Sequence, residues 1–148
     1  MENYNEKLTY EYRSLVLELF KNVSGQESDR DVSTALIFAK AKEKEFTDRT
    51  EMTTEWLRKR VYRPDVYKVM PQWIAKAAYF CLLDLSDWVP SSSNIWFAMI
   101  GLFIRIEGGK KPNYDELVKK LPDALNVKQG QDWLRICIEL VKKQQEKD

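Results

Sequence analysis

Apolar residues along most of the chain recur every three or four positions, the spacing that places them on one side of an α-helix. The first such segment contains Leu8, Tyr12, Leu15, Val16, Leu19, Phe20 and Val23. A polar stretch over residues 24–31 interrupts the pattern, which resumes at Val32. We therefore expect helices over residues 8–23 and 31–46. A short helix over residues 56–63 is expected next. It should end at residue 63, because Pro64 disfavours helical geometry at the residue before it.

Two central segments are more apolar than a surface helix requires. Residues 71–88 are apolar in nearly every direction around the helix axis, and residues 95–104 contain no polar side chain. Between them, residues 90–94 are rich in Ser and Asn, which favour turns and helix N-caps. We expect the two segments to form a central helical hairpin with residues 95–104 buried. Gly101 should be a point of close contact, because glycine inside a helix otherwise costs about 1 kcal/mol.

The second arm of this hairpin leaves one alternative open. Residues 102–106 are rich in strand-forming residues, and Gly108-Gly109 could close a hairpin turn instead of ending a helix. We favour the helix. Further along, Asn113 and Glu116 have the spacing of a capping arrangement and predict a helix that stops near Leu121.

A last helix is expected over about residues 131–145. Its apolar side chains cover an arc of about 200° at 100° per residue, wider than an ordinary amphipathic stripe. This helix is therefore either deeply packed or also contacts a partner. The residues of the arc are Trp133, Leu134, Ile136, Cys137, Ile138, Leu140 and Val141.

These elements predict an all-α fold, a compact bundle of about six to seven helices around the apolar hairpin. We find no internal repeat, low-complexity tract or long linker, so residues 1–148 are expected to form a single helical domain. The length agrees, since a chain of this size can bury one sizeable core.

Charge is balanced overall but uneven along the chain. The formal net charge is +1, while residues 1–55 hold 12 acidic and 8 basic side chains and residues 56–148 hold 11 and 16. A polyanionic partner would therefore be expected to bind to residues 56–148. The N-terminus lacks the basic start and apolar run of a secretory signal, which favours a cytoplasmic or nuclear location. The longest uncharged apolar stretch, residues 95–104, is about half of what a membrane-spanning helix needs, so no membrane span is expected.

The chain contains no histidine, which removes the commonest general base, the Ser-His and Cys-His systems and most zinc sites. Cys81 and Cys137 sit among apolar residues and are expected to be buried, reduced thiols in preference to a disulfide. The loop around Gly108-Gly109 lacks the spaced glycines of a phosphate-binding loop. We accordingly predict no catalytic residues, cofactor or metal.

Paired carboxylates are the one catalytic alternative that histidine's absence leaves. Asp84 and Asp87 are three residues apart on the apolar segment 71–88, close enough to face one cleft. They could equally mark the solvent-facing strip or the end of that helix.

The main candidate binding site is the basic aromatic segment 56–68, which has five cations, one anion and three aromatic residues. On a helix, Trp56, Lys59, Arg60 and Arg63 share one stripe, so cations could meet phosphates while an aromatic ring stacks on a base. An ordinary solvated helix face, or a surface for an acidic partner, is the alternative. The candidate residues are Trp56, Arg58, Lys59, Arg60, Tyr62, Arg63, Tyr67 and Lys68.

A second candidate surface is apolar. Tyr10 and Leu17 are seven residues apart, on the side of the first helix away from its main apolar face. Together they would make a protein-binding patch, although single exposed apolar residues are also normal. We expect a non-catalytic helical protein-interaction or regulatory module, a small subunit of a larger assembly, with a protein partner or a second copy of itself. The alternatives are an RNA- or DNA-binding protein and, more remotely, a carboxylate-based enzyme.

Overall fold

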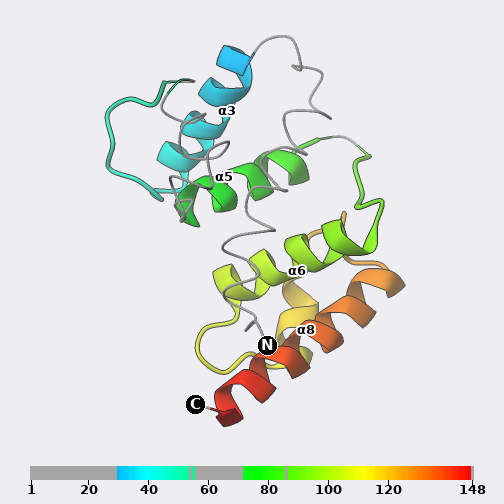
Figure 1. The fold of residues 1–148 in the computed structure, drawn as a ribbon. Coiled ribbons are helices and arrows are strands. Elements are labelled where there is room, and N and C mark those ends of the chain that lie inside the picture. The colour runs from blue at the N-terminus through cyan, green and yellow to red at the C-terminus, as the bar shows by residue number, and fades with distance from the viewer. Residues whose placement is uncertain (1–29, 54, 56–71, 86, 148) are drawn as a thin grey trace.

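The computed structural model describes residues 30–53, 55, 72–85 and 87–147. Within these ranges the chain is helical and contains no strand, so the all-α prediction is confirmed there. The elements in chain order are α3 (Arg30–Glu43), α5 (Gln72–Leu83), α6 (Ser93–Glu107), α7 (Tyr114–Leu117), the 3-10 turn η2 (Val118–Lys120) and α8 (Lys128–Lys147), as Figure 1 shows. These five α-helices are fewer than the six to seven predicted. The helices expected over residues 8–23 and 56–63 lie outside the described ranges.

The described helices pair as α3 with α5 and α6 with α8 (Figure 1). The helices α5 and α6 also touch, but through fewer residues than either uses for its main partner. The predicted central hairpin is thus only part of the arrangement, because among the described helices each arm packs chiefly against one distant in the sequence. The described helices include none that is both long and apolar enough to cross a membrane.

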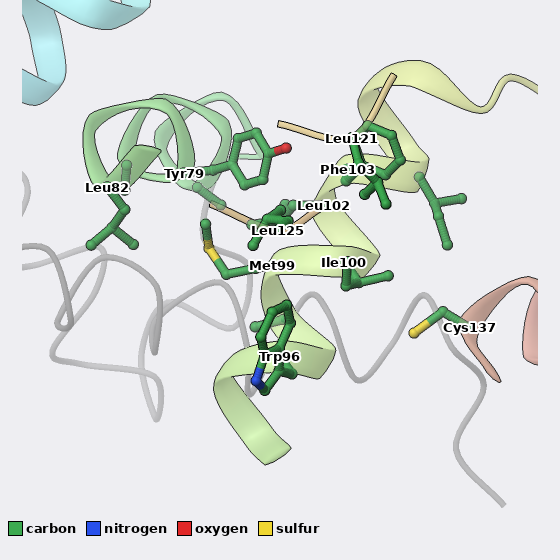
Figure 2. Close-up of a cluster of buried hydrophobic side chains, with 14 of the residues drawn as sticks. Tyr79, Leu82, Trp96, Met99, Ile100, Leu102, Phe103, Leu121, Leu125 and Cys137 are labelled. Carbon is green, nitrogen blue, oxygen red and sulfur yellow. The ribbon is translucent and has the colours of Figure 1, made fainter. Parts of the chain in front are cut away.

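The prediction that residues 95–104 form the buried centre is confirmed. Figure 2 shows side chains of α6 between residues of α5, α8 and the segment that follows α7. Phe103 retains 1% of its exposed surface and Leu125 retains none. The buried residues of α6 are Trp96, Ala98, Met99, Ile100, Gly101, Leu102, Phe103 and Ile104.

The end of α3 shows how this helix is terminated without a glycine. Glu45 adopts a left-handed conformation with φ of 59°. Its N–H donates to the carbonyl of Lys42 at 3.1 Å, and the N–H of Phe46 donates to the carbonyl of Ala41 at 2.8 Å. This pair of bonds defines the Schellman motif, which satisfies carbonyls at a helix C-terminus. It also turns Phe46 back towards α5.

Side-chain caps set the starts of the later helices. The Ser92 hydroxyl accepts from the N–H of Ile95 at 3.4 Å, and the Asn113 side chain accepts from the N–H of Glu116 at 3.1 Å. The helix predicted to open at Asn113 is therefore confirmed. Because α6 continues to Glu107, residues 102–106 are helical and the strand alternative is wrong. Gly109, with φ of 61°, lies just beyond the end of α6.

Candidate functional site

All ten predicted binding residues lie outside the described ranges. Tyr10 and Leu17 belong to this group, so the apolar patch on the first predicted helix stays a prediction. The basic aromatic segment 56–68 belongs to it as well, and its residues are Trp56, Arg58, Lys59, Arg60, Tyr62, Arg63, Tyr67 and Lys68.

The carboxylate pair proposed for acid-base chemistry does not have the predicted placement. Helix α5 ends at Leu83, earlier than the expected Trp88, so Asp84 and Asp87 do not share a helix face. Asp87 has a left-handed backbone with φ of 59° beyond the helix end, and both carboxylates are exposed. Two exposed groups on a turning backbone do not form the buried cleft that the enzymatic alternative required.

A hollow of about 360 Å³ instead lies between α3 and α5. Four of the residues that line it come from successive turns of α3, and the other three come from the last turn of α5 and the two residues after that helix. Leu36, at its edge, keeps 45% of its surface exposed. We call this hollow the α3–α5 groove, and it is lined by Leu36, Ala39, Lys40, Glu43, Cys81, Asp84 and Leu85.

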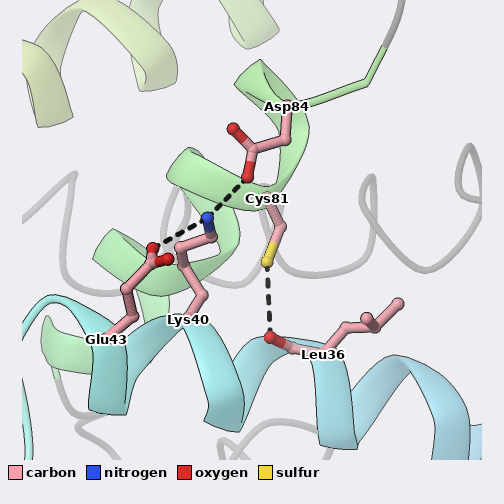
Figure 3. Close-up of polar contacts among 5 residues, drawn as sticks. All are labelled: Leu36, Lys40, Glu43, Cys81 and Asp84. Atoms are coloured by element: carbon pink, nitrogen blue, oxygen red, sulfur yellow. Dashed lines mark hydrogen bonds and ion pairs between the residues drawn. The ribbon is translucent and has the colours of Figure 1, made fainter.

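An ion-pair network forms the polar rim of the groove (Figure 3). The Lys40 ammonium lies 2.6 Å from Asp84 Oδ2 and 3.0 Å from Glu43 Oε2. The hydrogen bond that the Lys40 ammonium donates to the Asp84 carboxylate is the main cause that raises the pKa of Lys40, while partial burial opposes it. The Lys40 side chain is 18% exposed and both carboxylates are 62% exposed. The rim therefore covers its one cation and presents two carboxylates to solvent.

The thiol of Cys81 links the two helices beside this rim. Its Sγ donates a weak hydrogen bond of 3.7 Å to the carbonyl oxygen of Leu36 (Figure 3). Burial raises the pKa of Cys81 to about 12, so the thiol is neutral near pH 7. Because the thiolate is the reactive form, Cys81 is a wall of the groove and not a nucleophile. Cys137 is likewise a free, buried thiol, so the prediction of two reduced cysteines is confirmed.

Cations and aromatic rings also meet beside the end of α3. The Lys44 ammonium lies 4.6 Å from the centroid of the Phe80 ring, and the Lys76 ammonium lies 5.7 Å from that of Phe46. The two rings are 5.9 Å apart. Glu43 and Glu45 flank Lys44 in the sequence, so the cluster lacks the excess positive charge of a phosphate-binding surface. Its contacts fix the segment after α3 onto α5.

Helix α8 has a partly exposed apolar strip on the side facing solvent. Ile136 is 48% exposed and Leu140, one turn later, is 38% exposed. Trp133 is half-buried and packs edge-on against Phe97, with ring centroids 6.4 Å apart. We call Trp133, Ile136 and Leu140 the α8 outer face. The broad apolar arc predicted for this helix is thus packed on one side, where Leu134, Cys137 and Ile138 are buried, and solvent-facing on the other.

Sequence reasoning missed the groove because Leu36 and Ala39 have the spacing of core residues. Lys40 lies on α3 and Asp84 lies just beyond the end of α5, and no local pattern in the sequence says that these two residues meet. Within the described part of the chain, no cluster of three or more Cys, Asp or Glu residues is placed to hold a metal ion. The chain matches no protein-family model, no curated protein and no solved structure at a significant level.

Proposed function

We propose that the chain is a non-catalytic protein-interaction module, a small subunit of a larger assembly, whose α3–α5 groove receives an apolar side chain of a partner protein. The observation that carries this proposal is an apolar hollow at the surface with a charged rim. We also propose that the helices predicted over residues 8–23 and 56–63 join the five described α-helices in one bundle of six to seven helices.

The size and lining of the groove favour an inserted side chain. A volume of about 360 Å³ is near the lower end of the roughly 300–1,000 Å³ typical of ligand sites. Leu36, Ala39 and Leu85 offer apolar surface, and burying one large apolar side chain contributes roughly 1.5–3 kcal/mol. One anchoring residue of a partner could therefore supply a large share of a moderate affinity.

The acidic rim favours a positive charge in the partner beside the anchoring apolar residue. Lys40 is already bonded to both carboxylates, whereas Glu43 and Asp84 each keep a second oxygen and most of their surface towards solvent. A cation in the partner can bond these oxygens, and arginine suits carboxylates best because its planar fork donates in pairs. We propose a partner segment that carries a large apolar residue next to Arg or Lys.

Selection from a phage-displayed library of random twelve-residue peptides tests this proposal on the full chain. We expect enrichment of peptides with a large apolar residue adjacent to Arg or Lys, and binding measured by fluorescence polarisation. Ala39→Trp should fill the groove and weaken the selected peptide at least tenfold. Lys120→Trp, an equally bulky change at an exposed residue of η2, should leave affinity unchanged.

Charge is tested separately on the same selected peptide. Glu43→Gln with Asp84→Asn should weaken binding several-fold at low salt and remove most of its salt dependence, because exposed ion pairs are screened. Selected peptides that bind Ala39→Trp as tightly as the wild-type protein would exclude the groove. Enrichment of acidic peptides would contradict the assignment of the rim.

The nucleic-acid alternative rests on the cations of segment 56–68 and has its own test. Three phosphate contacts through Lys59, Arg60 and Arg63 imply a log-log salt slope of roughly −2 to −3. Changing all three to Glu should abolish binding to a labelled RNA or DNA oligonucleotide. No binding of either oligonucleotide by the wild-type protein at low salt would end this alternative.

A further inference from the structure

The α8 outer face lies at the middle of its helix. Helix α8 spans Lys128–Lys147, and Ile136 and Leu140 lie on either side of its midpoint. Both keep a large exposed fraction, at 48% and 38%. An apolar pair centred on a helix of about 30 Å can meet the same pair on a second copy by a two-fold rotation, with each residue used twice.

We infer that two copies of this chain associate through the α8 outer face, with their α8 helices antiparallel. In an antiparallel pair centred between residues 136 and 140, Ile136 lies opposite Leu140 of the second copy, and Leu140 lies opposite Ile136. This surface is separate from the α3–α5 groove and goes beyond the function proposed above.

Charges beside the strip favour the antiparallel arrangement. At about 100° per residue, Asp132 and Lys143 lie on the same side of the Ile136–Leu140 strip, roughly 9 Å and 7.5 Å from its centre in opposite directions. In an antiparallel pair the same sides face each other, so Asp132 meets Lys143 of the second copy. The pair forms twice by symmetry, and the two helix dipoles oppose each other favourably.

The Asp132 carboxylate is accessible for an ion pair with Lys143 of the second copy. Its carboxylate lies 3.6 Å from Arg135 within the same helix, which is longer than a hydrogen bond, and its side chain is 53% exposed. The Arg135 guanidinium lies over the Tyr114 ring, 4.2 Å from its centroid, so this cation is held towards α7. Lys143 is exposed on the side where the second copy's Asp132 would lie.

The small size of the face indicates a weak dimer. One helix face about 30 Å long and 10 Å wide is smaller than the roughly 800 Å² per partner of a stable complex. We expect a dissociation constant on the order of 10 μM to 1 mM, which corresponds to about −7 to −4 kcal/mol. Association should therefore depend on protein concentration.

Sedimentation equilibrium of the full chain from about 5 μM to 1 mM tests the inference. The average mass should rise from 17.5 kDa towards twice that value. Ile136→Glu with Leu140→Glu should keep the chain monomeric over the whole range. Val89→Glu removes an equally exposed apolar residue elsewhere and should leave association unchanged.

Charge reversal then tests the register. Asp132→Lys and Lys143→Asp should each weaken the dimer at least threefold, and the two changes together should restore it. In addition, a mixture of Asp132→Cys and Lys143→Cys proteins should cross-link faster with a short bismaleimide than either protein alone. Cys81 and Cys137 are buried and do not compete.

A mass that stays at one chain up to 1 mM would overturn the inference, as would a dimer that survives Ile136→Glu with Leu140→Glu. Faster cross-linking of either the Asp132→Cys or the Lys143→Cys protein alone would overturn the antiparallel register. Peptide binding to the groove should be the same in the monomeric variant. Failure of this inference is therefore distinguishable from failure of the proposed function.

Discussion

The α3–α5 pair and the α6–α8 pair differ in the size of the side chains that they bury. Helix α6 buries eight residues, most of them large, whereas the buried side chains described on α3 are Thr34, Ile37 and Ala41. The buried residues of α5 include the three alanines Ala75, Ala77 and Ala78 beside the larger Ile74, Tyr79 and Leu82. Small residues let two helices approach closely but provide little apolar burial. The comparison indicates that α6 and α8 supply most of the stability, while the α3–α5 pair leaves an open hollow at the surface.

The largest effect should come from truncating the core on α6. Phe103 is 1% exposed, and Phe103→Ala should destabilise the protein by roughly 3–5 kcal/mol through lost burial and a cavity. Urea unfolding followed by circular dichroism measures this change. Leu36→Ala, at the half-exposed edge of the groove, should cost below about 1 kcal/mol. Equal losses for both variants would contradict the assignment of stability to the α6–α8 side.

A glycine in the first turn of α8 should rank second. A Cβ at Gly130 would lie against the carbonyl oxygen of Leu125 and 3.0 Å from the Trp96 ring. Gly130→Ala should therefore destabilise by about 1–3 kcal/mol, despite alanine's better helix propensity. Gly109→Ala is the matched control, because nothing lies within 4 Å of its Cβ and only its left-handed backbone opposes the change. A stabilised Gly130→Ala protein would show that this close approach does not exist.

The ion pair at the groove rim should matter less. Lys40→Met should cost about 0.5–1 kcal/mol, because both partner carboxylates are well exposed to water. The folded-state pKa of Lys40 is raised above 10.5, so the stabilising charge is fully present below the unfolded-state value. It is lost as pH rises through the raised value. The difference between wild type and Lys40→Met should therefore be constant from pH 7 to 9 and shrink above about pH 10.5.

The smallest expected effect is a gain. Glu45 holds a left-handed backbone at the end of α3, a conformation that glycine adopts without steric cost. Glu45→Gly should stabilise the protein by up to about 1 kcal/mol. Asp48→Gly, in the nearby exposed segment, serves as the comparison and should not be stabilising. A destabilised Glu45→Gly protein would argue against the Schellman geometry at this helix end.

Local patterns predicted helices well because their causes are local. The cap at Asn113, the end near Gly108 and the burial of residues 95–104 follow from neighbouring residues and from the apolar run. The end of α3 was placed three residues late, because Glu45 stops the helix in a conformation that its side chain does not favour. The end of α5 was placed late because the period of Leu85 and Trp88 continues the apolar pattern after the backbone has turned.

The groove could not be predicted, since it depends on which helices meet. Leu36 and Cys81 are 45 residues apart, and an apolar residue facing a neighbouring helix has the same spacing as one facing a hollow. Ile136 and Leu140 posed the same difficulty. Their arc was predicted correctly, but only the packing of α8 on α6 separates its covered side from its exposed side.

The two cysteines can report how often each helix pair opens in the folded protein. Cys81 belongs to the α3–α5 pair and Cys137 to α8, both thiols are buried, and burial raises the pKa of each to about 12. A thiol reagent can therefore modify either residue only when the surrounding helices separate. The labelling rate at each position measures the opening free energy of one pair under native conditions, without mutation. If the pairs open independently, Cys81 should label faster than Cys137.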